Sequence, residues 1–313
     1  MKLHQLRILL AVAQHGSIHE ASRSLHVSQP ALSKAIAELE RELGVTLMSR
    51  SVRGVSLTAY GLALVKRASV VEQELRHALE DIEAIRGHAE ARLNIGFTAV
   101  ASSGPLPEAM AAFRQRFPNV DLCAFELRPQ QILEGLREGR LDLGLISTNS
   151  GPGTGAFQWE PLFAVGMSLA VRPGHPLRRA SRLRPLLDAD WLTLDPLDDP
   201  GSPLPSLLRL HRLDMPRRIV QSASNLLGLQ LAARTDLISM WSDFVFHGTG
   251  GPLRLVQESL LQLPIRDELP DFRVFLVYRS ADLMTQACAE FSKEVRHRAR
   301  LMVPPRRGAR AGA

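Results

Sequence analysis

Seven apolar side chains between residues 64 and 85 recur at alternating spacings of four and three. This alternation is a period of about 3.5 residues, which keeps the apolar side chains on one narrow stripe that faces a partner helix. Packing of an amphipathic helix on its own core is the alternative, but that stripe is wider and its period is nearer 3.6. The pattern therefore predicts one long helix, from about Thr58 to Gly87, that pairs with a second copy. The seven residues are Leu64, Ala68, Val71, Leu75, Ala78, Ile82 and Ile85.

Three short helices are predicted before residue 44. Gly16 ends the first of them, and Ser17 and Glu20 form a capping box that starts the second at Ile18. Ser28 is a good N-cap for the third helix, and Pro30 suits its first turn. Two helices joined by so short a turn predict a helix-turn-helix.

The third of these helices has two contrasting faces. Its predicted core stripe consists of Leu32, Ile36, Leu39 and Leu43. The other face carries small polar groups and one cation, a composition that suits entry into the major groove of DNA, where Gln pairs with adenine and Lys with guanine or phosphate. A three-helix packing unit with a solvated face is the alternative. The predicted DNA-contacting residues are Ser28, Gln29, Pro30, Ser33 and Lys34.

A basic β-hairpin is predicted next. Its strands are expected at residues 45–48 and 55–57, with Gly54 at the tip. Arg50 and Arg53 flank this tip, where they are placed to enter a minor groove or to bind phosphates. Surface arginines without a ligand are the alternative. Beside a recognition helix, however, a basic hairpin is typical of a wing.

From Leu93 onward, strand and helix patterns alternate, which predicts parallel α/β layers. The predicted fold class is therefore α plus α/β. The net charge is +6, but residues 1–57 carry only +3, and the last 18 residues carry six Arg and no acid. This tail predicts a solvated end, with an auxiliary DNA-contacting arm as the alternative.

Several classes of protein are disfavoured by what the sequence lacks. It has only two cysteines, Cys123 and Cys288, no apolar run long enough for a membrane span and no secretion leader, which together predict a cytoplasmic protein. Neither nucleophile-elbow, zinc-protease, P-loop nor paired-cysteine motifs occur. We therefore expect no enzyme activity, no catalytic residues, no metal and no cofactor.

Longer motifs resemble the LysR-type transcriptional regulators. They include G-S-I-x-E-A-S-R-S-L from Gly16, V-S-Q-P-A-L-S-K-A-I-A-E-L-E from Val27 and R-G-V-S-L-T-A-Y-G from Arg53. Looser motifs follow, among them L-N-I-G-F-T from Leu93 and G-R-L-D-L-G-L-I from Gly139. Met48 and Ser49 depart from the usual pattern, in which Phe and an acidic or polar residue are common.

The resemblance implies a domain order. Residues 1–57 would form a winged helix-turn-helix domain and residues 58–91 a linker and dimerisation helix. Residues 92–301 would form an effector domain similar to a periplasmic solute-binding protein, with lobe I at 92–163 and 267–301 and lobe II at 164–266. Residues 302–313 would be a disordered Arg-rich tail. The implied function is effector-controlled binding to an inverted-repeat DNA site by a dimer or homotetramer, with RNA polymerase as a further partner.

Effector-binding residues are expected at the carboxyl ends of strands and at helix N-termini. The latter favour anions, so the expected effector is a small anionic metabolite. Helix capping is the alternative role for these hydroxyl groups. A solute-binding module whose N-terminal region only oligomerises it is the alternative function. The expected effector-binding residues are Thr98, Ser102, Ser103, Thr148, Ser222 and Ser224.

Overall fold

The computed structural model describes residues 1–51, 54–86, 92–153, 155, 157–199, 201–247 and 253–301. The chain forms two compact units. Met1–Ala91 and Leu133–Asp142 make up the first, and Arg92–Ile132 and Leu143–Ala313 the second. No helix in the described ranges has the length and apolarity needed to cross a membrane.

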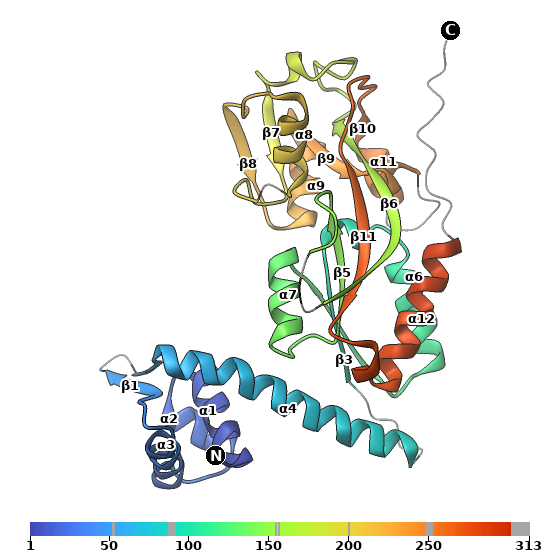
Figure 1. Cartoon of the computed structure of the whole chain (residues 1–313). Helices are drawn as coiled ribbons and strands as arrows, with labels where there is room; N and C mark the ends of the chain where they lie inside the picture. Colours follow the sequence, from blue (N-terminus) through green and yellow to red (C-terminus); the bar gives the residue numbers. More distant parts are fainter. Residues whose placement is uncertain are drawn as a thin grey trace. The chain divides into compact units, whose positions relative to one another are not determined.

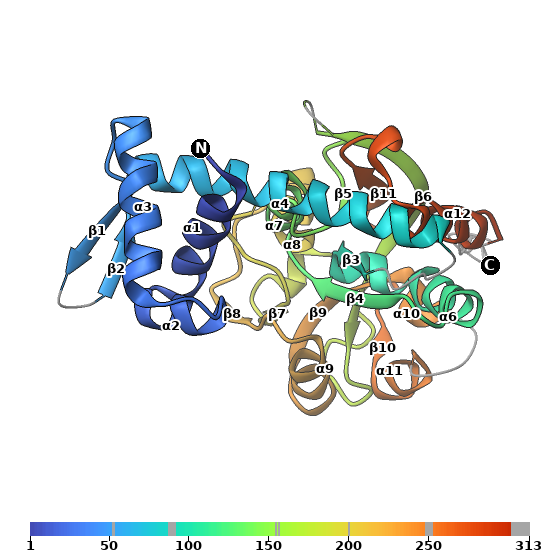
Figure 2. The ribbon, with the colours of Figure 1, turned by 90° about the horizontal axis from the view of Figure 1, so that it is seen from below.

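The first unit consists of helices and one hairpin, in the order that the sequence predicted. In Figure 2 three short helices and the hairpin gather around the first part of a long helix. The elements are α1 (Leu3–His15), α2 (Ile18–Ser24), α3 (Gln29–Leu43), β1 (Met48–Ser51), β2 (Gly54–Leu57) and α4 (Ala59–Ile85).

Local capping fixes the ends of the short helices as predicted. Gly16 has a φ of 61°, a left-handed conformation that costs glycine little, and its amide donates to the carbonyl of Val12. The Ser17 hydroxyl accepts from the amide of Glu20 at the start of α2. Likewise, the Ser28 hydroxyl accepts from the amide of Ala31 at the start of α3. These caps turn the chain sharply twice and bring three helices together within the first 43 residues.

The core of this part is built from the predicted stripes. Leu9, Leu32 and Leu39 are fully buried and pack in one cluster with Ile36 and other apolar residues of α1–α3. Leu43 was expected in the same stripe but is 40% exposed. It is the last residue of α3, where the chain leaves the helix, so its side chain lies past the end of the core.

The hairpin strands lie closer to the tip than predicted. Met48 pairs with Leu57 and Ser51 with Gly54, so the first strand begins at residue 48 rather than 45, and Gly54 begins the second strand instead of forming the tip. The preceding backbone is bound to α3 instead, because the Glu40 carboxylate accepts from the amides of Leu47 and Met48 at 2.7 and 3.2 Å. This contact anchors the hairpin to α3.

The start of α4 lies directly against the chain that leads into the hairpin. The Thr58 hydroxyl donates to the carbonyl of Thr46 at 2.7 Å and accepts from the amide of Gly61 at 3.1 Å. A Cβ atom on Gly61 would lie 2.1 Å from the carbonyl oxygen of Leu47. Only glycine permits this approach, so Gly61 fixes how the long helix leaves the N-terminal domain.

The second unit is an α/β structure around one sheet. Its strands are β3 (Arg92–Phe97), β4 (Asp121–Glu126), β5 (Leu143–Thr148), β6 (Gln158–Val171), β7 (Asp190–Thr193), β8 (Arg218–Gln221), β9 (Leu237–Ser242), β10 (Leu261–Gln262) and β11 (Asp271–Tyr278). Its helices are α5 (Ala99–Ser102), α6 (Leu106–Arg116), η1 (Arg184–Leu186), α8 (Pro203–His211), α9 (Asn225–Arg234), α10 (Asp243–His247), α11 (Leu253–Ser259), η2 (Ala281–Leu283) and α12 (Gln286–Leu301), and α7 (Pro129–Arg137) leads into the first unit.

Two long antiparallel strands connect two parallel sheet regions (Figure 1). Among the described strands the order is β4-β3-β5-β11-β6-β9-β7-β8, with β10 beside β6. Strand β3 runs parallel to β4 and β5, and β7 runs parallel to β8 and β9. The predicted strand 167–171 is longer in the structure, because residues 158–166 pair with β11. Strand β8 was not predicted.

Helices α6 and α12 lie side by side along the β3–β5 region (Figures 1 and 2). The rings of Phe113 and Phe291, both buried, meet edge to face with centroids 5.3 Å apart. The Arg296 guanidinium of α12 also binds the Glu160 carboxylate of β6 at 2.8 Å. The start of the basic C-terminal segment is therefore part of a packed helix, whereas residues 302–313 lie outside the described residues.

Candidate functional site

The exposed face of α3 carries most of the residues predicted to contact DNA. Ser28, Gln29, Pro30 and Lys34 are exposed, and Ser33 is half-buried. Leu32, Ile36 and Leu39 of the same helix are buried, so a surface of small polar groups and one cation is held by a rigid core. Such a helix has the dimensions and hydrogen-bonding groups to enter a major groove.

One side chain on this face is held in place by α2. The side-chain amide nitrogen of Gln29 lies 2.7 Å from Nδ1 of His19. The amide nitrogen only donates, so Nδ1 is the acceptor and the other ring nitrogen carries the proton. His19 lies ten residues before Gln29 and was not predicted as a functional residue.

The two predicted wing arginines are placed differently. Arg50 lies on β1, where its backbone pairs with Val55 of β2. Arg53 lies outside the described residues. The antiparallel hairpin itself is present and is attached to α3 through Glu40, as a wing requires.

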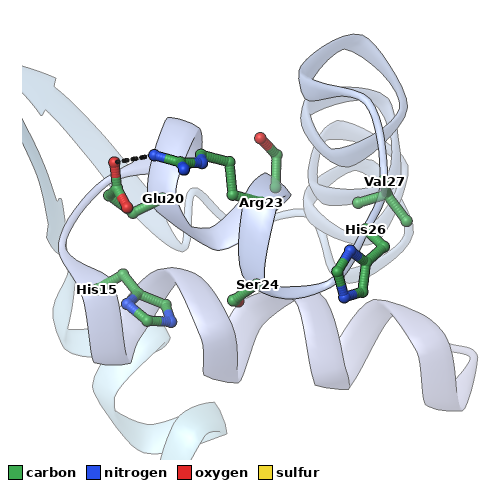
Figure 3. A pocket seen from close by; sticks show the side chains of 7 residues that line it. His15, Glu20, Arg23, Ser24, His26 and Val27 are labelled. Carbon is green, nitrogen blue, oxygen red and sulfur yellow. Dashed lines mark ion pairs between the residues drawn. The ribbon is translucent and has the colours of Figure 1, made fainter.

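A broad surface hollow of about 700 Å³ lies on the first unit (Figure 3). It is lined by the end of α1, by α2 and by the turn before α3, and it is open to solvent. Glu20 and Arg23 form an ion pair of 3.9 Å within it. Its open, polar lining gives it none of the enclosure by which small-molecule sites bury a ligand.

A more enclosed cavity of about 420 Å³ lies in the second unit. Apolar side chains from several elements form most of its lining, among them Met167 of β6, Leu192 of β7 and Trp241 of β9. Its size and its mainly apolar lining are typical of a small-molecule site.

The polar groups of this cavity come from strand ends and from one helix start. Glu126 is the last residue of β4, Asp195 follows β7, and Asn225 begins α9. The Asn225 side-chain amide donates to the Glu126 carboxylate at 2.7 Å. This placement is the one expected for ligands of open α/β sheets, at strand carboxyl ends.

Both carboxyl groups in the lining are perturbed by their surroundings. Burial, with a smaller contribution from the negative charges of Asp199 and Glu126, raises the pKa of Asp195 to about 6, and the positive charge of Arg128 partly opposes this shift. Burial also raises the pKa of Glu126, and the hydrogen bond from Asn225 lowers it. Both shifts show that the cavity wall disfavours the ionised carboxylates, and at Asp195 the neighbouring negative charges add to this effect.

Two family models match the two parts of the chain in which these surfaces lie. Residues 3–62 match the model described as "Bacterial regulatory helix-turn-helix protein, lysR family", and residues 86–300 match "LysR substrate binding domain". The second match alone covers more than half of the chain. The chain belongs to the LysR family. This LysR-type protein is a DNA-binding transcriptional regulator and not an enzyme, because its family consists of regulators.

Individual relatives are also LysR-type regulators. The HTH-type transcriptional regulator GbpR of Azospirillum brasilense is 28% identical over 260 residues, which cover 80% of this chain and 75% of GbpR. OxyR of Escherichia coli (strain K12), a dual regulator, is 34% identical over 180 residues, 56% of this chain and 57% of OxyR. The match therefore spans less than two thirds of OxyR. Full-length CbnR in complex with its target DNA has a TM-score of 0.67 at 20% identity, covering 95% of this chain and 99% of CbnR.

The cavity of this LysR-type regulator includes two of the six predicted effector-binding residues, Ser102 and Ser103. The other four are not among the described lining residues. Their hydroxyl groups form hydrogen bonds with neighbouring residues instead. Thr98 bonds to Ser147 at 2.8 Å, and Thr148 accepts from the amide of Ser150. Ser222 and Ser224 bond to each other, and Ser224 caps α9.

Sequence reasoning missed the charged lining residues of the regulator. Asp195 lies two residues after Thr193, the last residue of β7, and Glu126 ends β4. The strand-end rule would have included both residues had it been applied to carboxylates as well as to hydroxyl groups.

Proposed function

We propose that this regulator binds an inverted-repeat DNA site as a dimer and that a small molecule in the cavity of the second unit controls this binding. The observation that supports DNA binding is the exposed polar face of α3. Residues 1–57 would be the DNA-binding domain, 58–91 the dimerisation helix and 92–301 the effector domain. We also propose that the regulator is cytoplasmic and that RNA polymerase is a further partner.

Helix α4 supports dimerisation through its apolar stripe. Val71, Leu75 and Ile82 are 44%, 38% and 46% exposed in the single chain. Exposed apolar side chains at this regular spacing are stabilised when they pack against the same stripe of a second copy. A two-fold dimer would then present two recognition helices to two half-sites, and pairing of dimers would give the homotetramer.

The cavity supports control by a small molecule. A ligand shifts the balance between two conformations only if it binds one of them more tightly. The cavity wall combines residues of β4 and α5 with residues of β7, β9 and α9, so a change in their spacing would change the ligand contacts. The expectation of an anionic ligand finds no support in the charged lining residues, both of which are acidic.

Fluorescence anisotropy with a selected genomic DNA fragment tests the DNA part. Gln29→Ala should lose about 1–3 kcal/mol of discrimination between matched and mismatched sites. Arg53→Ala should weaken binding to all sequences and lower the salt dependence, because it removes a phosphate contact. Arg184→Ala removes an exposed cation from the second unit and serves as the control. Normal discrimination and affinity in both test variants would overturn the assignment of this surface.

Sedimentation tests the dimer. Leu75→Glu places a charge in the stripe and should convert dimers to monomers, with a parallel loss of DNA affinity. Glu83→Gln, on the same helix but outside the stripe, should leave assembly unchanged. An unchanged sedimentation coefficient in Leu75→Glu would contradict dimerisation through α4.

A further inference from the structure

The charged residues that line the cavity all have the same sign. Glu126 and Asp195 are the two ionisable residues among its described lining, and no Lys, Arg or His is included. The other lining residues are apolar or carry neutral polar groups. The wall therefore supplies negative potential and apolar contact but no cation to bind an anionic ligand.

Asp195 is the more strongly perturbed of the two acids. Its backbone is fixed, since its amide and carbonyl both bond to the hydroxyl of Thr193 at 3.3 and 3.0 Å. Within the described part of the chain, its carboxylate has no hydrogen bond or ion pair. A half-buried carboxylate without such a partner is unfavourable when ionised, which agrees with the upward shift of its pKa. The backbone thus positions the Asp195 carboxylate, and within the described residues no hydrogen bond or ion pair compensates its charge directly.

The second acid increases the negative potential. Glu126 is bound by Asn225, a neutral donor that leaves the negative charge in place. Its charge and that of Asp199 both act on Asp195, and Arg128 is the cation that acts against them. An anionic ligand would be repelled here, and a neutral ligand would leave Asp195 without a direct ion-pair partner. A cationic group on the ligand would both attract the negatively charged wall and supply Asp195 with an ion-pair partner.

The remaining wall suits an apolar body. Met167, Leu192 and Leu229 line it together with Met240 and Trp241. Methionine adapts to varied ligand shapes, and tryptophan binds both apolar groups and organic cations. We propose that the cavity binds an organic cation, with an ammonium or similar nitrogen group at Asp195 and Glu126 and an apolar body against these side chains. This inference rests on the proposed role of the cavity as the effector site.

A matched set of three compounds tests the ligand class on the full-length protein. 4-Phenylbutylamine, 4-phenylbutanol and 4-phenylbutanoate share one apolar skeleton and differ in carrying an ammonium, a hydroxyl or a carboxylate. Isothermal titration at pH 7.5 should show the amine binding at least about tenfold more tightly than the alcohol, and the carboxylate most weakly. Equal binding of amine and alcohol, tightest binding of the carboxylate, or binding of none of the three would overturn the proposal.

Two variants assign the charge preference to the cavity. Asp195→Asn should reduce amine affinity at least about tenfold and leave the alcohol unchanged. Asp214→Asn, in an exposed loop, is the matched control and should keep the wild-type order. Glu126→Gln provides a second variant and should weaken the amine selectively as well. An amine preference that survives both cavity substitutions would show that the amine binds elsewhere and would overturn the assignment.

A DNA measurement separates this inference from the proposed function. If the amine binds in an Asp195-dependent manner but leaves DNA affinity unchanged, the ligand class holds and the regulatory role of the cavity fails. If DNA affinity instead responds to the alcohol or the carboxylate through the same cavity, the regulatory role holds and the cationic class fails.

Discussion

The side-chain amide of Asn225 donates to Oε1 of Glu126 at 2.7 Å, which joins the start of α9 to the end of β4 at the cavity. The two residues are far apart in the sequence: Glu126 ends a strand of one parallel region of the sheet, and α9 leads into β9 of the other. This contact lowers the pKa of Glu126 against the raising effect of burial. It therefore couples the charge at the cavity to the spacing between two sheet regions.

Asn225→Ala should raise the pKa of Glu126, because the loss of a donor removes stabilisation of the ionised carboxylate. Carbon-13 NMR of the glutamate carboxyl groups measures this shift directly. The loss of stability should stay below about 1 kcal/mol, since the contact is largely exposed. Asn149→Ala removes a comparable bond to Ser206 and should leave the pKa of Glu126 in place. A pKa of Glu126 that is unchanged in Asn225→Ala would contradict the role of this hydrogen bond.

Asp195 should make the ligand-free protein less stable as the pH rises from about 4 to about 6. Its pKa is raised to about 6 in the folded chain, from about 3.9 in an unfolded one, so the folded state binds more protons in this interval. The contribution to the free energy of unfolding is at most about 3 kcal/mol. Asp195→Asn should remove this slope and be more stable than the wild type at pH 7.5. Melting temperatures from pH 4 to 7.5 measure it, with Asp214→Asn as the control. Parallel wild-type and Asp195→Asn curves would refute the shift.

His19 should determine how accurately Gln29 distinguishes bases. Because Nδ1 of His19 accepts from the Gln29 amide, it orients a side chain that would otherwise rotate freely at the surface. His19→Ala should reduce discrimination between matched and mismatched sites by about 1 kcal/mol and leave the salt dependence unaltered. His26→Ala, an exposed histidine in the turn before α3, is the control. A weakened salt dependence without a change in discrimination would indicate that His19 contacts phosphate instead.

The sequence allowed the first unit to be predicted well because its structure depends on local signals. Gly16, Ser17 and Ser28 act on residues within four positions of themselves, and the apolar periods then determine which faces are buried. Strand β8 and the first half of β6 are different. They form strands because distant residues pair with them, as Tyr278 does with Gln158. Periodicity within a short window does not contain that information.

The cavity shows the same limit for site residues. Thr98 was a reasonable candidate from its position after a strand, but its hydroxyl group is hydrogen-bonded to the hydroxyl group of Ser147. The pKa of Asp195 is raised only because the side chain is buried and because Glu126 and Asp199 lie near it. Both outcomes depend on tertiary contacts between segments that are distant in sequence, so the strand-end rule located the region but not the decisive side chains.

The opposite face of α4 should contribute to stability through a buried polar cluster. Nε2 of His77 lies 3.0 Å from Oδ1 of Asp142, and the Gln73 amide donates to the same oxygen at 2.8 Å. Because the carboxylate accepts, Nε2 of His77 carries the proton, and the buried Nδ1 has no hydrogen-bond partner among the described residues. His77→Ala should cost about 1–3 kcal/mol, since Asp142 loses a donor in a buried environment.

A double-mutant cycle measures the interaction between these two residues. Asp142→Ala should also destabilise the unit, and the double variant should lose less than the two single variants together, because each single change leaves the other group without its partner. Leu79→Ala, at a position 62% exposed on the same helix, should stay within about 0.5 kcal/mol of the wild type. Chemical denaturation followed by amide hydrogen exchange in α4 reports these differences for the first unit alone. Strict additivity would show that His77 and Asp142 stabilise α4 independently, and the cluster would then have no cooperative role.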